Sequence, residues 1–154
     1  MKRLCTAVLC LMILTFAQIS YASAKKSPAP PDKASMQKIL DAWATLNPDN
    51  VAMYYATGPH TFFDIAPLKY NSWDEYQTGV KAVLAGYKSA KFTVNDDAAV
   101  HAEGDPVWAT ATVSSEMTTK AGKVEMSNFR WTVIWQDENG KWVIVHDHFS
   151  APIQ

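Results

Sequence analysis

The chain has 154 residues, of which 48% are hydrophobic and 19% charged, and its formal net charge is −1. This length suits one ordinary domain with a core of its own. The near-neutral charge excludes the basic surface with which nucleic-acid-binding proteins neutralise phosphates.

The first 24 residues have the order typical of a signal peptide. Lys2 and Arg3 precede an apolar run from Leu4 to about Ile19, and small residues follow as far as Ala24. A retained membrane anchor is the alternative, but the run is shorter than the ~20 residues that a membrane-spanning helix needs. We therefore expect a secreted or periplasmic protein, cleaved after Ala24 and not bound to a membrane afterwards.

Cleavage would also change the chemistry available to the chain. It would remove both cysteines, Cys5 and Cys10, together with two of the 14 basic residues and none of the 15 acids, leaving a net charge of −3. A disulfide, a thiol nucleophile or a thiolate metal site is then excluded. The proline-rich residues 25–31 predict a flexible leader before a single domain at residues 32–154.

Three helices are predicted in the first half of that domain. Apolar residues recur at helical spacing over residues 36–46, 51–55 and 73–87. Asp32 or Ser35 can cap the first helix, and Ser72 with Glu75 forms a capping box for the third. Between the second and third helices, residues 60–65 predict a short strand that leads into a loop.

The second half of the chain predicts long antiparallel strands. Strand-like runs cover residues 91–100, 107–119, 124–136 and 141–150, and Asn139-Gly140 between the last two is a strong hairpin signal. Helices followed by such a meander predict an α+β domain with its helices on one side of the sheet. The last strands are apolar on both faces, which favours a second subunit on the uncovered face.

The two closing runs of the chain resemble a known superfamily. Residues 130–135 and 140–152, with their G-K-W, H-x-H and S-x-P pieces, look like the end of the calcium/calmodulin-dependent kinase association domain. Over residues 32–152 the chain resembles the SnoaL-like group of the nuclear-transport-factor-2-like superfamily, which includes ketosteroid isomerases. The resemblance implies a cone-shaped, strongly curved antiparallel sheet with three N-terminal helices packed on its concave face, and a homodimer through the convex face.

The resemblance also implies where side chains point. The expected lining of an apolar small-molecule pocket is Trp43, Tyr55, Phe63, Trp73, Trp108, Thr112, Ser114, Phe129, Trp131 and Phe149. The expected dimer interface is Arg130, Trp142, Ile144 and His146.

Three residues are candidates for catalysis. Asp64 matches the strand-end aspartate that is the general base of ketosteroid isomerases, or it is an ordinary loop cap. Asp147 lies near the acid/base aspartate of SnoaL-type cyclases, or it is a buried carboxylate paired with a tyrosine. Tyr76 could donate to either carboxylate, or it is a core aromatic. The tyrosine–aspartate oxyanion pair of the isomerases is not reproduced, which argues against steroid isomerisation.

Other chemistry is not expected. His146 and His148 share a strand face, but we interpret them as packing or interface residues, because no carboxylate lies at a suitable spacing. We predict no metal and no cofactor. The favoured function is binding of a small hydrophobic ligand. The alternatives are a cofactor-independent acid/base enzyme of the isomerase, cyclase or dehydratase type using Asp64 or Asp147, and an oligomerisation module like the kinase association domain.

The signal peptide makes a direct prediction. The exported protein should begin at Lys25, because signal peptidase cleaves after a small-x-small ending such as Ala22-Ser23-Ala24. Intact-mass measurement of the exported protein checks this. An exported protein that still carries Met1 would contradict it.

Overall fold

The structure is a computed structural model that describes residues 28–152. The predicted signal peptide, its cleavage site and residues 25–27 of the leader lie outside the described residues. Within the described part, no helix is long and apolar enough to cross a membrane.

The helical segments follow the predicted order. α1 (Lys33–Trp43) begins at Asp32, whose carboxylate accepts a hydrogen bond from the Ser35 amide at 2.8 Å. α2 (Trp73–Leu84) begins at Ser72. The second predicted helix takes the form of two 3₁₀ turns, η1 (Pro48–Asn50) and η2 (Ala52–Tyr54), because the chain becomes extended again at Tyr55 to pair with Ile144.

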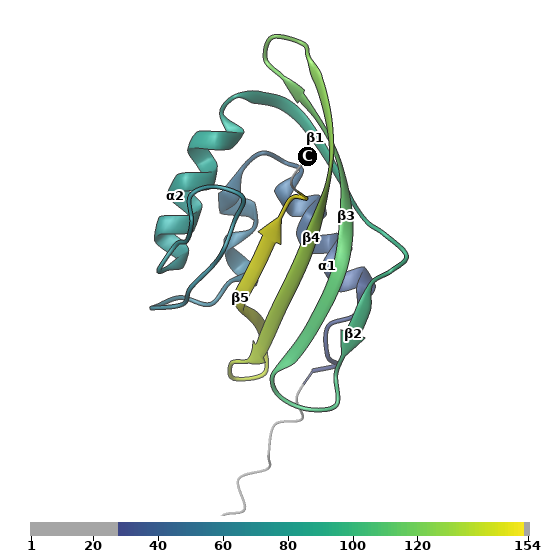
Figure 1. Cartoon of the computed structure of the whole chain (residues 1–154). Helices are drawn as coiled ribbons and strands as arrows, with labels where there is room; N and C mark the ends of the chain where they lie inside the picture. The colour runs from purple at the N-terminus through teal and green to yellow at the C-terminus, as the bar shows by residue number, and fades with distance from the viewer. Residues whose placement is uncertain (1–27, 153–154) are drawn as a thin grey trace, which may run out of the picture.

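Five antiparallel strands form one sheet (Figure 1). They are β1 (Tyr87–Val94), β2 (Ala99–His101), β3 (Val107–Thr119), β4 (Val124–Asp137) and β5 (Trp142–Ser150). The order is β1-β3-β4-β5, and β2 pairs with the other end of β3. Residues 91–100, predicted as one strand, are divided into β1 and β2 by a turn that Thr112 holds through bonds to Asn95 and Asp97. Asn139 and Gly140 both have positive φ, as the predicted hairpin turn requires.

The short strand predicted at residues 60–65 is a pair of isolated bridges. Phe62 pairs with Tyr70, and Phe63 pairs in parallel with His148. The Phe63 amide donates to the Asp147 carbonyl at 2.9 Å, and the Phe149 amide donates to the Phe63 carbonyl at 3.0 Å. This segment therefore lies along the outer edge of β5.

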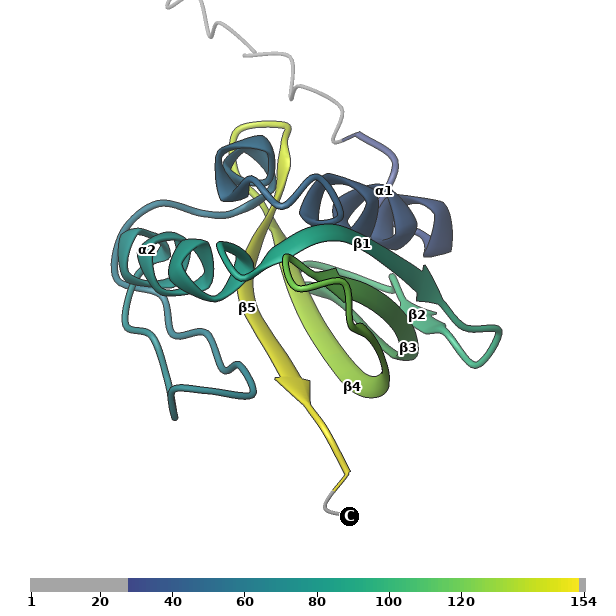
Figure 2. The ribbon, with the colours of Figure 1, turned by 90° about the horizontal axis from the view of Figure 1, so that it is seen from above.

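Both α-helices pack on the same, concave side of the curved sheet (Figure 2). Alternate residues of β3, from Val107 to Val113, are buried beneath them. At the β1 edge of the sheet, the Gln37 side chain donates to the Phe92 carbonyl and accepts from the Val94 amide, both at 2.9 Å. Gln37 thus satisfies backbone groups of β1 and fixes α1 against that strand. The predicted fold class is confirmed.

The expected direction of one set of β3 side chains is wrong. Trp108, Thr112 and Ser114 lie on the convex face, because the alternate residues are the buried ones. The inner face of β3 has small side chains where β4 has large ones: Ala111 is opposite Trp131, and Val107 is opposite Trp135. The tryptophans of β4 fill the space there, so the inner positions of β3 have room only for small residues.

The expected direction of the first residues of β5 is also wrong. Ile144 is fully buried and pairs with Trp135, whereas His146 pairs with Ile134. A register shift between Ile134 and Trp135 inserts one extra residue in β5, which reverses its alternation. Trp142 shares the inner face with Ile144, packs on the core, and donates its indole N–H to the Pro28 carbonyl at 3.2 Å. Neither Trp142 nor Ile144 can belong to a convex interface.

Candidate binding pocket

A cavity of about 290 Å³ lies between the helices and the concave face of the sheet. Its wall comes from α1, α2, the four strands β1, β3, β4 and β5, and the loop after Phe63. The residues that line it are Leu40, Trp43, Asp64, Ile65, Ala66, Tyr76, Val80, Val83, Leu84, Tyr87, Phe92, Met117, Phe129 and Phe149. Trp43, Phe129, Phe149, Asp64 and Tyr76 are thus brought together, as their predicted roles require.

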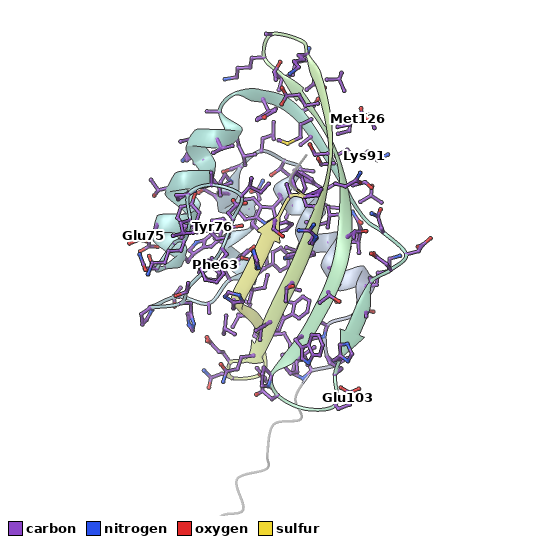
Figure 3. The ribbon with its side chains drawn as sticks, viewed as in Figure 1. Phe63, Glu75, Tyr76, Lys91, Glu103 and Met126 are labelled. Carbon is purple, nitrogen blue, oxygen red and sulfur yellow. The ribbon has the colours of Figure 1, made fainter. Side chains whose placement is uncertain are left out.

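The start of α2 places one wall of the cavity. The Ser72 hydroxyl accepts from the Glu75 amide at 3.2 Å, and Glu75 accepts from the Asn71 amide at 2.7 Å. This is the predicted capping box, except that Glu75 accepts from the amide of Asn71 and not from that of Ser72. With the start of α2 fixed, Tyr76 and Val80 are one turn apart and face the cavity. Figure 3 shows Tyr76 between α2 and the sheet.

The pairing of Phe63 with β5 places Asp64 at the cavity wall. The Asp64 side chain is half-buried, and its Oδ1 accepts a hydrogen bond from the Ile65 amide at 2.7 Å. Burial raises the pKa of this carboxyl above its usual value, and the bond to Ile65 opposes the rise. The phenol of Tyr76 stays neutral at physiological pH, since burial raises its pKa well above 10. Asp64 can therefore accept a proton or a hydrogen bond, and Tyr76 can donate one.

Four other residues that were expected to line the cavity lie in the core behind its wall or on the other side of the sheet edge. Tyr55 stacks on Trp73 with ring centroids 4.3 Å apart, and both are core residues. Trp131 stacks on Phe149 at 5.2 Å from the core side. Phe63 packs edge-on against His146 and His148, at 5.4 and 5.5 Å, on the other side of the sheet edge. Tyr55, Phe63, Trp73 and Trp131 therefore do not line the cavity.

Several lining residues were missed from the sequence although a signal for them existed. Val80 and Leu84 belong to the same helical stripe as Tyr76. Met117 is in phase with Ala109, Ala111 and Val113, the apolar residues that mark the inner face of β3, and Phe92 lies on the paired strand β1. Ile65 and Ala66 had no signal, because their position depends on a loop.

Asp147 lies in the core and not at the cavity wall. It is fully buried, and its Oδ2 accepts a hydrogen bond from the Tyr55 hydroxyl at 2.6 Å. The indole of Trp43, which lines the cavity, donates to the same hydroxyl at 3.3 Å. Among the described residues, no hydrogen bond reaches Asp147 Oδ1. Burial raises the pKa of Asp147 to about 8, with the negative charge of Asp64 adding to the rise and the Tyr55 bond opposing it.

The residues from 28 to 152 hold no group of three or more His, Cys, Asp or Glu side chains that could bind a metal ion. His146 Nδ1 lies 2.7 Å from the Thr61 carbonyl, so that nitrogen carries the proton and donates the bond. This contact serves the packing of the segment against β5.

The buried carboxyl of Asp147 predicts a pH-dependent stability. An unfolded aspartate titrates near 3.8, whereas folded Asp147 titrates near 8, so unfolding releases a proton between these values. The contribution of Asp147 to the free energy of unfolding is therefore greatest below pH 4. It falls by up to about 1.4 kcal/mol per pH unit as the pH rises, and it is lost once the pH passes 8, where folded Asp147 ionises as well. Asp147→Asn, which is neutral throughout, should remove most of this slope in urea unfolding measured from pH 4 to pH 8.

The control is Asp105→Asn, which replaces an exposed aspartate in the loop before β3 and should keep the wild-type slope. The free energies of unfolding of wild type and Asp147→Asn are compared at each pH. If their difference stays constant, Asp147 is ionised in the folded protein and the prediction is wrong.

The fold has many relatives among solved structures. A nuclear transport factor 2 (NTF2-like) superfamily protein from Salmonella enterica is 15% identical, with a TM-score of 0.68 over 79% of this chain and 92% of that one. A putative calcium/calmodulin dependent protein kinase II association domain from Xanthomonas campestris is 24% identical, with a TM-score of 0.68 over 84% of this chain and 94% of that one.

A putative dehydratase of the NTF2-like family from Streptomyces avermitilis is 12% identical, with a TM-score of 0.68 over 79% of this chain and 96% of that one. At such identities these likenesses show the fold. No curated protein matches the chain significantly. The model of the SnoaL-like domain matches residues 33–154, which is nearly the whole folded domain. The chain therefore belongs to the SnoaL-like domain family, and it has the fold of nuclear-transport-factor-2-like proteins.

Proposed function

We propose that this protein binds a small, largely apolar molecule in the cavity between its helices and its sheet. The observation that carries the proposal is the composition of the wall, in which Asp64 is the one charged residue among fourteen and apolar or aromatic residues form the rest. Ligand pockets are typically apolar with a few polar groups that fix orientation, and about 300 Å³ is the lower end of their size range. A small ligand with one polar group fits this description.

Acid/base catalysis by Asp64 is the second candidate. A half-buried carboxyl with a raised pKa, facing a cavity that Tyr76 also lines, has the properties of a general base. A putative dehydratase from Streptomyces avermitilis has the same fold, so the fold is compatible with acid/base chemistry. Asp147 does not touch the cavity, so its part in either function is to hold Tyr55 and Trp43 in place.

Ligand recovered from the purified protein tests both candidates. Val83→Trp places a large side chain at the cavity wall from a helix position that is 56% exposed, so the fold should tolerate it. Ala82→Trp is the matched control, since Ala82 is exposed on the same helix and does not line the cavity. Native mass spectrometry of protein expressed with its full sequence should find a small molecule on wild type and on Ala82→Trp, and not on Val83→Trp.

Asp64→Asn separates binding from catalysis in the same experiment. If Asp64 is a general base, this nearly isosteric variant should retain unconverted substrate, which differs from the wild-type ligand in mass or chromatographic retention. If the protein only binds, both proteins should carry the same molecule. Equal recovery of ligand from Val83→Trp and wild type would contradict the proposed cavity.

Export through a cleaved signal peptide and a homodimer through the convex face remain proposals of ours. Trp108 is 42% exposed on that face and stacks on His101 with centroids 3.8 Å apart, which supports a contact surface there. Arg130 and His146 also point to this side. The likeness to association domains supports assembly, and a larger ring like a kinase hub is the alternative.

Ile134→Glu tests the dimer. Ile134 is half-buried on the convex face, so a glutamate there should leave the fold intact and weaken a dimer by burying an unpaired charge in the interface. Sedimentation of wild type at micromolar concentration should give twice the monomer mass, and Ile134→Glu should shift it toward the monomer. A monomeric wild type, or a variant that stays fully dimeric, would refute this interface. Ile144→Glu is unsuitable, because Ile144 lies in the core.

A further inference from the structure

The cavity wall has a one-sided distribution of charge. It holds no lysine, arginine or histidine, and Asp64 is its single ionisable carboxyl. The neighbouring groups whose titration the charge of Asp64 affects are Asp147 and the phenols of Tyr55, Tyr70 and Tyr76. None of them is a basic residue, so among the described residues no positive charge compensates Asp64 at the cavity wall.

Asp64 also forms no ion pair with another described residue. The two salt bridges among the described residues, Lys33–Asp96 and Lys123–Glu125, lie elsewhere. Oδ1 of Asp64 accepts the Ile65 amide, and no described residue donates to Oδ2. Removing a carboxylate from water without a partner is unfavourable, and a cation that arrived with a ligand would relieve this cost.

The strand order separates the carboxyl from the apolar end of the cavity. Asp64 follows the segment that pairs with the outer edge of β5, while Phe92 and Met117 come from β1 and β3 at the opposite side of the sheet. Tyr87 lies at that far end as well, where its hydroxyl is already bonded to Glu125 at 3.0 Å and so leaves its ring for the wall. A ligand that spans the cavity therefore meets an acid at one end and apolar side chains along its length.

Aromatic rings near Asp64 suit the same ligand. Trp43, Tyr76 and Phe149 line the middle of the cavity between α1, α2 and β5. Aromatic faces attract ammonium groups as well as apolar chains. An anionic ligand would instead be repelled by the charge of Asp64, because no basic residue lines the cavity.

We propose that the cavity is specific for lipophilic amines, with the ammonium group paired to Asp64 and the apolar body lying along α2 toward β1. This rests on the proposed binding function and adds the chemical class of the ligand.

Three probes of nearly equal shape test the class. They are 4-phenylbutylamine, 4-phenylbutanol and 4-phenylbutyrate, titrated calorimetrically into the purified protein at pH 7. The amine should bind about tenfold or more tighter than the alcohol, since charge-assisted hydrogen bonds are about twice as strong as neutral ones, and the carboxylate should bind weakest. Asp64→Asn should lose most of the affinity for the amine and keep that for the alcohol, while Asp105→Asn should behave as wild type.

The outcomes separate this inference from the function on which it rests. Equal binding of amine and alcohol, or tighter binding of the carboxylate, would overturn the amine class and leave an apolar binding site. Amine binding that survives Asp64→Asn would overturn the pairing with Asp64. Absence of binding by all three probes would overturn the inference and count against the proposed function. The wild-type series decides the class even if Asp64→Asn fails to fold.

Discussion

The pairing of residues 55–63 with the outer edge of β5 is the constraint on which the site depends. A strand edge has unpaired backbone groups, and this segment satisfies them through the bonds of Ala56 to Ile144 and of Phe63 to Asp147 and Phe149. The segment does not form a regular strand, because it pairs only at isolated positions. Its docking closes one side of the cavity and brings Asp64, the next residue, to the wall.

The aromatic core behind the cavity wall also holds the docked segment in place. The Tyr55 hydroxyl bonds to Asp147 on β5, and the Tyr55 ring stacks on Trp73 at the start of α2. One side chain thus connects the docked segment, the last strand and a helix. The buried polar bond is retained where an apolar pair could have packed, and the protein accommodates it by favouring the neutral form of Asp147.

A putative kinase association domain and a putative dehydratase share this fold, so the fold alone does not determine the function of this chain. The cavity wall of this chain has one acidic residue, no basic residue and several aromatic rings. The structure separates Asp64 and Asp147, the two carboxyl candidates of the sequence: one faces the cavity, and the other is enclosed in the core. Their environments differ enough that the two carboxyls cannot serve the same role.

The sequence by itself determined the two α-helices, the last three strands and the Asn139-Gly140 hairpin, because these depend on local periodicity and on turn residues. The resemblance of its closing runs indicated the family. The sequence also singled out Asp64 and Tyr76, which the structure places at the cavity wall. Only the tertiary structure decided which side chains face inward. The register shift in β5 moved Ile144 into the core, and the size of Trp131 on β4 set which residues of β3 are inside. Both depend on contacts between strands, which the pattern of a single strand does not contain.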